Sequence, residues 1–314
     1  MQALPTGEAQ EPSTPALGIA SDTIGKSHRS NMRYFEKISK RSEPSSESES
    51  NWFGRYLTLA AIRLLRPFRP CNGHVLFLTS KFCVKYSTTT HLCEVAAMKW
   101  VAGNTSVPVP KVYYSFERKG VTYIVMERID GEVIARNWHQ RSDDSKAALL
   151  LQLRNMFAEM RAVPPPHEGI IAAADLKKLH DYRISPGPSH SPNEGFGPFL
   201  NSKDFHLFLR GGIKGPTDNI DVQQLVTMHE DHEYATCFTH GDLSSFNILI
   251  RDGRIVGIID WEMAGWLPDY WEYTSAWNVN PYNEFWREEI DKFLDSYPKE
   301  LEMERLRRRY FGDF

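Results

Sequence analysis

Residues 240–247, His-Gly-Asp-Leu-Ser-Ser-Phe-Asn, combine polar side chains that suit phosphoryl transfer. A second acid, Asp260, follows Asp242 by eighteen residues. Metal-dependent phosphoryl transfer needs one acid to orient an attacking hydroxyl and accept its proton. An Asn and another acid then hold the metal ions that neutralise the phosphates. The spacing therefore indicates a kinase, with Asp242 as the catalytic residue and Asn247 and Asp260 as the metal ligands.

The residues between Asn247 and Asp260 predict a β-hairpin. Two apolar, β-branched runs, 247–250 and 255–259, are separated by Arg-Asp-Gly-Arg, which is a strong turn signal. A hairpin brings its open ends together, so Asn247 and Asp260 should lie at one end, with Asp242 in the preceding loop. Asp and Asn are also common in turns and at strand ends. For three such residues at this spacing, behind a His and a Gly, the functional interpretation is favoured.

These motifs resemble the aminoglycoside phosphotransferase and choline kinase-like families, which share the protein-kinase fold and have His-Gly-Asp where protein kinases have His-Arg-Asp. Fungal-type members continue with Ile-Asp-Trp-Glu, a Pro and Trp-Glu-Tyr, to which residues 259–262, Pro268 and residues 271–273 are similar. The resemblance is strongest over residues 238–273. It implies an α+β, two-lobed, protein-kinase-like fold, with a small β-rich N-lobe and a larger, mainly helical C-lobe.

The chain is expected to divide into three parts. Residues 1–50 are rich in Ser, with Pro and mixed charge, and bury too little apolar surface to offset the entropy of ordering, so they predict a disordered tail. Residues 51–128 would form the nucleotide-binding N-lobe, and residues 129–314 the C-lobe with the catalytic loop and substrate site. Residues 52–68 predict an amphipathic helix. Its Arg residues would permit a membrane-surface role, although packing against the small lobe is favoured.

A lysine and a glutamate complete the expected N-lobe site. Phe-Cys-Val-Lys at residues 82–85 echoes the Val-Ala-Ile-Lys strand of kinases. Strand side chains alternate between faces, so Lys85 can reach phosphates while its neighbours enter the core; a solvent-facing lysine is the alternative. A helix is predicted over residues 90–102. The resemblance implies that Glu94 on this helix pairs with Lys85, whereas stabilisation of the helix N-terminus is the competing explanation.

The link between the lobes is expected just after a second hairpin. Residues 111–116 and 121–126 predict its two strands, and the following residues 126–131 resemble the family's hinge. There the backbone binds the adenine edge, so the resemblance implies Glu127 and Ile129 as nucleotide-binding candidates. Further helices are predicted over residues 145–163, 204–209, 222–229, 285–297 and 301–310.

Bulk composition excludes several classes of protein. The 314-residue chain has a formal net charge of −3, which gives no electrostatic case for a nucleic-acid partner. Its four cysteines form no Cys-x-x-Cys pair and suit a reducing compartment, so a cytoplasmic location is expected. No apolar run predicts a transmembrane helix, and the N-terminus does not resemble a secretory signal. The sequence does not indicate an oligomeric state.

The resemblance implies ATP and Mg²⁺ as cofactors and transfer of the γ-phosphate to a hydroxyl. The chain has no Gly-x-Gly-x-x-Gly run, and only Gly73 stands near the expected place. This departure leaves GTP, slow turnover or an inactive protein open. Asp260 leads quickly to Pro268, without the long segment ending in Ala-Pro-Glu that follows the metal-binding Asp of protein kinases. A small-molecule acceptor is therefore favoured over a protein.

An amine-bearing acceptor is one interpretation of the tryptophan content near the C-terminus. Five tryptophans follow residue 260, with acids among them, and such a set could bind an amine through cation–π contacts. Core packing is the plainer explanation of these tryptophans. Two functions remain open at this stage. The catalytic trio favours an active small-molecule O-phosphotransferase, and the missing Gly run favours a kinase-like binding or scaffold protein without turnover.

Overall fold

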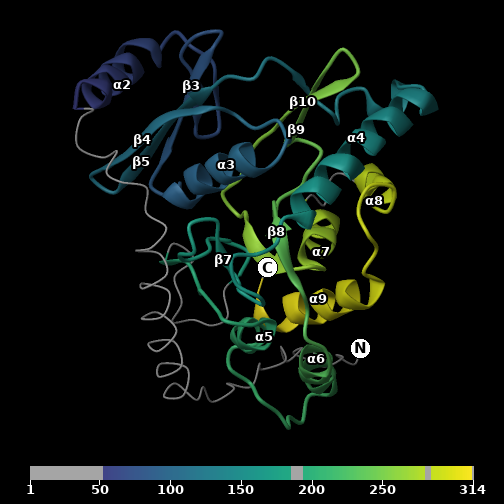
Figure 1. Ribbon diagram of the computed structural model, residues 1–314. Helices are drawn as coiled ribbons and strands as arrows, with labels where there is room; N and C mark the ends of the chain where they lie inside the picture. The colour runs from purple at the N-terminus through teal and green to yellow at the C-terminus, as the bar shows by residue number, and fades with distance from the viewer. Residues whose placement is uncertain (1–51, 185–193, 280–283, 313–314) are drawn as a thin grey trace, which may run out of the picture.

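The computed structural model describes residues 52–184, 194–279 and 284–312. The tail expected over residues 1–50 lies outside these ranges. The described chain has a β-rich part followed by a mainly helical part, and the two lie side by side (Figure 1). It is an α+β, two-lobed, protein-kinase-like fold, as expected. No helix within the described ranges is long and apolar enough to cross a bilayer.

The N-lobe is built on an antiparallel five-stranded sheet with the order β1-β2-β3-β5-β4. Its strands are β1 (Cys71–Asn72), β2 (Val75–Phe77), β3 (Phe82–Ser87), β4 (Val112–Arg118) and β5 (Val121–Glu127). Helix α3 (Leu92–Asn104) covers one face of the sheet and α2 (Trp52–Leu65) packs on the other. Alternation along β3 explains this arrangement, because Cys83 belongs to the core on the α3 side and Val84 to the small cluster beside α2.

The predicted second hairpin is confirmed. Strands β4 and β5 pair around Lys119 and Gly120, which have φ angles of 53° and 72°. Two consecutive left-handed residues form the turn whose twist matches that of paired strands, and Gly adopts this conformation without steric cost.

The C-lobe contains more strands than the sequence analysis predicted. Two three-stranded sheets have the orders β10-β9-β6 and β7-β11-β8. Their strands are β6 (Glu132–Val133), β7 (Ala172–Ala173), β8 (Thr236–Thr239), β9 (Ile248–Arg251), β10 (Arg254–Ile258) and β11 (Gly265–Pro268). Several of them are only two to four residues long. Strands β7, β8 and β11 are buried along their whole length and show no alternation, so periodicity could not predict them.

Helices surround these small sheets. They are a 3₁₀ turn at Trp138–Gln140, α4 (Asp143–Ala162), α5 (Ser202–Leu209), α6 (Ile220–Asp231), α7 (Trp271–Asn278), α8 (Glu284–Ile290) and α9 (Pro298–Phe311). The helix predicted over residues 285–297 is wrong in length, since α8 ends at Ile290. Pro298 occupies the first turn of α9, where its missing N–H costs nothing, and the residue before a Pro disfavours helix.

The tryptophans after residue 260 serve the core. Trp261, Trp266, Trp271 and Trp286 are all at most 3% exposed. Trp266 packs edge-on against Trp100 and Phe238. The plainer explanation of the tryptophan content therefore holds for these four residues, and the aromatic amine-binding alternative finds no exposed ring among them.

Candidate active site

The β9–β10 hairpin brings the predicted motif residues to one end, as expected. Its turn residues, Asp252 and Gly253, have φ angles of 51° and 73°, the left-handed pair that a tight hairpin requires. Asn247 lies directly before β9 and Asp260 shortly after β10. At the open end, the Ile259 amide donates to the Asn247 carbonyl at 2.9 Å.

His240 joins the catalytic loop to the segment that carries Asp260. Its Nε2 lies 3.0 Å from the Ile259 carbonyl oxygen, which can only accept, so Nε2 carries the proton. Its Nδ1 then accepts the amide N–H of Asp242 at 3.1 Å. Burial lowers the pKa of His240, in keeping with this neutral tautomer. The imidazole thus fixes the backbone of Asp242 relative to Ile259, the neighbour of Asp260.

Gly241 and Glu272 also fix the backbone of the catalytic loop. Gly241 has a φ of 80°, and a Cβ at this position would lie 2.8 Å from the Met263 carbonyl oxygen, so only glycine fits. The Glu272 carboxylate accepts the amides of His240 at 2.6 Å and Gly241 at 3.3 Å. Burial raises the pKa of Glu272, while His240 lowers it. Glu272 in α7 therefore gives the Trp-Glu-Tyr motif a role in positioning the loop.

Asp242 and Asn247 are in direct contact. The Asn247 side-chain amide donates to the Asp242 carbonyl at 2.8 Å and to its Oδ2 at 3.0 Å. The Asp242 side chain keeps 19% of its surface exposed, so a reactant can reach it. Burial raises the pKa of Asp242 to about 6, although the nearby Arg183 lowers it.

Arg183 is a site residue that the sequence analysis missed. Its Nη1 lies 3.5 Å from Asp242 Oδ1, and its Nη2 donates to the Gly241 carbonyl at 2.7 Å. Its Nε and Nη2 also donate to the two oxygens of Asp181 at 2.8 and 2.7 Å, so the guanidinium is held on both sides. The only sequence signal was Asp-Tyr-Arg in a segment rich in Pro, Gly and Ser, which is too common a pattern to single out.

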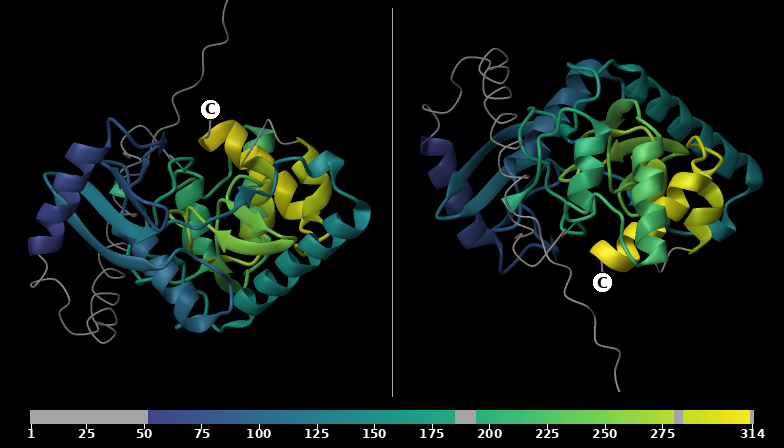
Figure 2. Two further views of the ribbon diagram at one scale, coloured as in Figure 1. Left: turned by 90° about the horizontal axis from the view of Figure 1, so that it is seen from above. Right: turned by 90° about the horizontal axis from the view of Figure 1, so that it is seen from below.

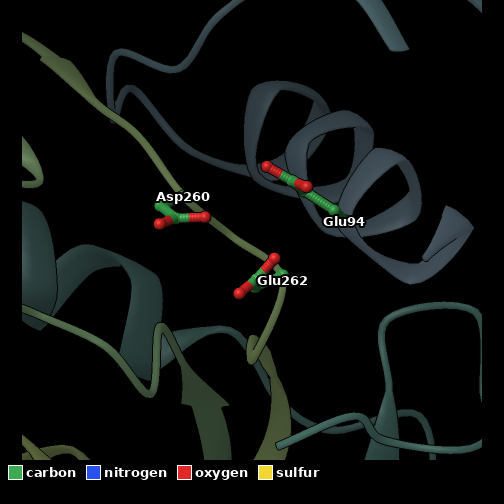
Figure 3. A group of neighbouring side chains, drawn as sticks. All are labelled: Glu94, Asp260 and Glu262. Atoms are coloured by element: carbon green, nitrogen blue, oxygen red, sulfur yellow. The ribbon is translucent and has the colours of Figure 1, made fainter. Parts of the chain in front are cut away.

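Three carboxylates surround the ammonium of Lys85. Its Nζ lies 2.9 Å from Glu94, 2.7 Å from Asp260 and 3.1 Å from Glu262. The expected contact between Lys85 and Glu94 is therefore present. Glu94 reaches the cluster from α3, whereas Asp260 and Glu262 come from the segment after β10, and the three acids converge (Figure 3). The contact of Glu262 with Lys85 was not predicted, although its position two residues after Asp260 could have indicated it.

The electrostatics of this cluster favour a charged lysine. Burial lowers the pKa of Lys85, but Glu94, Asp260 and Glu262 together outweigh burial and raise it above its usual value. Burial also raises the pKa of Glu94 and of Glu262, while Lys85 lowers both. Glu94 and Glu262 therefore depend on a nearby cation to remain ionised.

The same three carboxylates have the chemistry of a divalent-cation site. One ligand oxygen from each of Glu94, Asp260 and Glu262 can be chosen so that all lie within 4.8 Å of one another. Hard oxygen ligands of this kind suit Mg²⁺. Asp260 has a φ of 68°, a left-handed conformation that Asp tolerates better than most residues.

The two hinge candidates lie apart from this cluster. Glu127 ends β5, and its amide already donates to the Lys111 carbonyl at 2.9 Å. The next amide, that of Arg128, donates to the Lys81 carbonyl at 2.9 Å. Ile129 packs so closely on Gly257 that a Cβ there would lie 2.4 Å from its Cδ1. A nucleotide at this hinge would have to use the Glu127 carbonyl or the Ile129 backbone.

A small hollow of about 20 Å³, room for about one water molecule, lies beside Arg183. Its lining comes from the 181–184 segment, α7 and α9. The charged residues of the lining are three arginines and two acids, namely Arg183, Arg307, Arg308, Asp181 and Glu304.

Comparison with known proteins assigns the family. Residues 80–308 match the model of the phosphotransferase enzyme family, so the chain belongs to that family. An aminoglycoside 3'-phosphotransferase from Enterococcus faecalis is 24% identical over 218 residues, which span 67% of this chain and 74% of the relative. The clavilactone A biosynthesis cluster protein Y from Ampulloclitocybe clavipes is 27% identical over 227 residues. That match covers 64% of this chain and about half, 54%, of the relative.

Solved structures show the same fold. The aminoglycoside phosphotransferase APH(4)-Ia has a TM-score of 0.53 and 17% identity, with 80% of this chain and 88% of that chain covered. A thermostable mutant of that protein, in a ternary complex with AMP-PNP and hygromycin B, has a TM-score of 0.51 and 18% identity over 78% and 86% of the chains. At this level of identity, the likeness supports the protein-kinase-like fold and leaves the substrate to other arguments.

Proposed function

We propose that the chain transfers the γ-phosphate of ATP to a hydroxyl of a small molecule, with Mg²⁺ as the cofactor. The observation that carries this proposal is the meeting of two groups at the open end of the β9–β10 hairpin. One group is Asp242 with Asn247, and the other is Lys85 with Asp260. His240 links the two through the Ile259 carbonyl. Family membership adds that this arrangement lies in a phosphotransferase.

Asp242 is the proposed general base. As the acceptor oxygen bonds to the γ-phosphorus, the bond from that phosphorus to the ADP oxygen breaks, and the hydroxyl proton passes to the Asp242 carboxylate. A pKa of about 6 leaves this carboxylate mostly ionised at neutral pH and more basic than an ordinary aspartate. Arg183 and Asn247 hold the carboxylate in place through their contacts with its two oxygens.

Asn247 and Asp260 are the proposed ligands of Mg²⁺, and Glu262 has a carboxylate oxygen within 4.8 Å of one of Asp260 and is a further candidate ligand. When bound, the ion would neutralise phosphate charge, which is a main source of catalysis in phosphoryl transfer. Lys85 is the proposed phosphate contact. We infer that Lys85 leaves Asp260 and Glu262 when nucleotide arrives, while its contact with Glu94 keeps it in the cleft. Glu127 and Ile129 remain the proposed adenine contacts.

A small acceptor is supported by the path of the chain after Asp260. The chain enters β11 at Gly265 and α7 at Trp271, so little length remains for a segment that would bind a peptide.

A binding protein without turnover is the second candidate function. It is favoured by the short β1–β2 connection at Gly73, which offers no glycine-rich cover for phosphates, and by the ion pairs that engage Lys85. GTP in place of ATP is the corresponding alternative for the nucleotide. The four free cysteines are in keeping with a cytoplasmic location, which is part of the proposal.

A screen for phosphate transfer tests the proposed function. The full chain would be incubated with Mg²⁺ and either ATP or GTP, together with amino sugars, amino alcohols and polyhydroxylated metabolites. The proposal expects an acceptor-dependent rise in ADP or GDP release that is absent in Asp242→Ala. Nucleotide binding without transfer to any acceptor would favour the second candidate.

A further inference from the structure

Helix α2 is apolar around most of its circumference. Its sequence, Trp-Phe-Gly-Arg-Tyr-Leu-Thr-Leu-Ala-Ala-Ile-Arg-Leu-Leu, contains two charged residues, both of them arginines. A helix that is apolar all round is normally covered on all sides, either by protein or by lipid. The contacts of α2 within the N-lobe therefore show which of its faces lacks such a cover.

One face of α2 is covered by the N-lobe. Ala61, Ile62 and Leu65 pack on the small cluster that includes Leu76 and Val84. The Tyr114 hydroxyl donates to the Gly54 carbonyl at 2.6 Å and anchors the start of the helix. The helix is thus attached to the sheet along its length, which confirms that it packs against the small lobe.

The opposite face carries large apolar side chains that the described protein leaves exposed. The exposed fractions are 68% for Trp52, 65% for Phe53, 63% for Tyr56, 58% for Leu57 and 67% for Leu64. The helical period of 3.6 residues places Phe53, Tyr56, Leu57 and Leu64 on one side. Phe68, just beyond the helix, is also exposed. Contiguous exposed apolar surface of this kind marks an interaction site.

The charge around this face has a single sign. Every charged residue from position 52 to position 93 is basic, and the first acid is Glu94, although the whole chain has a net charge of −3. The exposed members of this set are Arg55, Arg63, Arg66, Arg69 and Lys81. Residues 1–51 contain acids and bases in similar number, so they do not complement a purely basic surface.

We propose that the exposed face of α2 docks onto an anionic membrane surface. Trp, Phe, Tyr and Leu side chains would enter the interfacial region, and the arginines would pair with lipid phosphates, a combination typical of helices that lie in the membrane interface. The cytoplasmic leaflet carries the anionic lipids that attract such basic segments. An anionic membrane surface thus matches both the apolar and the charged side chains of this face.

The position of α2 is compatible with an enzyme that works while docked. Helix α2 lies at the outer edge of the N-lobe, away from the C-lobe, in all three views (Figures 1 and 2). It packs on the sheet face opposite to α3, and α3 carries Glu94 of the active site. Docking through α2 would therefore leave the active-site side of the sheet uncovered. The inference does not depend on the proposed reaction.

Vesicle co-sedimentation of the full chain tests the proposal. The protein would be mixed with phosphatidylcholine vesicles with and without phosphatidylserine, at low and high salt. We expect binding that requires phosphatidylserine and weakens with salt. The double variants Phe53→Ser/Leu57→Ser and Arg63→Glu/Arg66→Glu should each reduce the partition coefficient by at least about tenfold. The first removes apolar side chains that would enter the interface, and the second reverses two charges that anionic lipids attract. All four positions are exposed, so unfolding is not expected, and circular dichroism would check this.

Matched controls lie on the other lobe. Leu151→Ser on α4 changes an exposed leucine, and Lys203→Glu on α5 reverses the charge of an exposed basic residue; both should leave vesicle binding unchanged. Lack of binding to anionic vesicles, or binding that the α2 variants do not weaken, would overturn the proposal. A dimer in the absence of lipid that dissociates in Phe53→Ser/Leu57→Ser would also overturn it and would assign this face to a second copy of the chain.

Discussion

At the residue scale, the environment of Asp242 is set by opposing effects. Burial raises its pKa, whereas Arg183 and the Asn247 amide favour the ionised form. Arg183 belongs to a loop far from the catalytic motif in sequence, yet it contacts both Gly241 and Asp242. Protein kinases have an Arg after the His of the catalytic loop, where this chain has Gly241. Here the guanidinium of Arg183, from a distant segment, contacts that loop instead.

Replacing Arg183 should impair transfer more than nucleotide binding. In Arg183→Met the Asp242 carboxylate loses a partner that holds it, so we expect kcat to fall by about 10- to 100-fold while KM for nucleotide stays nearly constant. Arg183→Lys should recover only part of the rate, because an ammonium lacks the forked geometry that serves Asp181 and Gly241 together. Steady-state kinetics would measure both. The control is Arg136→Met, which removes an exposed salt bridge. If Arg183→Met raised KM for nucleotide by the same factor by which it lowered kcat, a positioning role for Arg183 would be contradicted.

Gly241 offers a test of backbone geometry. Gly241→Ala must adopt a φ of 80° and also clear the Met263 carbonyl, 2.8 Å from the new Cβ. Gly120→Ala, at a φ of 72° with open space around it, incurs only the conformational cost of about 1–2 kcal/mol. Chemical denaturation should show a larger loss of unfolding free energy for Gly241→Ala. If the two variants lost the same unfolding free energy, the predicted clash between the new Cβ and the Met263 carbonyl would be contradicted.

At the element scale, hairpins were the most predictable part of the fold. Both β4–β5 and β9–β10 have β-branched strands around left-handed turn residues, so local sequence determines them. The sequence also indicated which residues meet at the open end of β9–β10. It could not indicate Arg183, because the approach of the 181–184 segment to the catalytic loop depends on tertiary packing. The short buried strands of the C-lobe were missed for the same reason.

The cluster formed by β3, α3 and the segment after β10 makes a prediction about metal binding. Lys85→Met removes the ammonium from among Glu94, Asp260 and Glu262, which leaves three buried or half-buried carboxylates without their cation. The variant should therefore be less stable than the wild type without metal. It should also gain more thermal stability from added Mn²⁺ in the absence of nucleotide. Differential scanning fluorimetry would measure both. A metal response no greater than that of the wild type would contradict the account of the three acids as a cation site.

At the scale of the whole molecule, the core of the C-lobe contains titratable groups in neutral form. His206 on α5 stacks on His229 of α6 at 4.2 Å, and its Nε2 lies 2.8 Å from the Tyr270 hydroxyl. Burial lowers the pKa of His206 to about 4 and that of His229 well below its usual value. These helices are therefore held together by histidines that must stay uncharged.

Stability should fall in mild acid for this reason. The unfolded chain takes up a proton at these histidines near pH 6.5, whereas the folded His206 does so only near pH 4. The contribution is thus present above about pH 6.5 and is lost as pH falls towards 4, by up to about 3 kcal/mol for His206. His206→Gln should flatten this part of the curve of unfolding free energy against pH. A curve of unchanged slope in the variant would contradict the assignment.

The two-lobed fold itself was predictable because one catalytic motif of high specificity implied it, and residues 80–308 match the family. The division of the lobes at residue 128 remains a proposal. Substrate identity is not encoded in any short motif, since recognition of an acceptor depends on side chains that tertiary packing brings together from several elements. For α2 the sequence predicted packing against the small lobe, but it did not indicate which face would stay exposed, because the helix is apolar around most of its circumference.

The most direct test of the account compares Asp242→Ala with Asp260→Ala in one pair of assays, thermal shift with Mg²⁺-ATP and release of ADP. The wild type should be stabilised by about 2.7 kcal/mol at a nucleotide concentration a hundred times Kd. Asp242→Ala should keep this shift and lose about 10²- to 10⁴-fold in rate, whereas Asp260→Ala should lose most of the shift. Equal loss of binding in the two variants, or no shift of the wild type with either ATP or GTP, would contradict the roles assigned to these two acids.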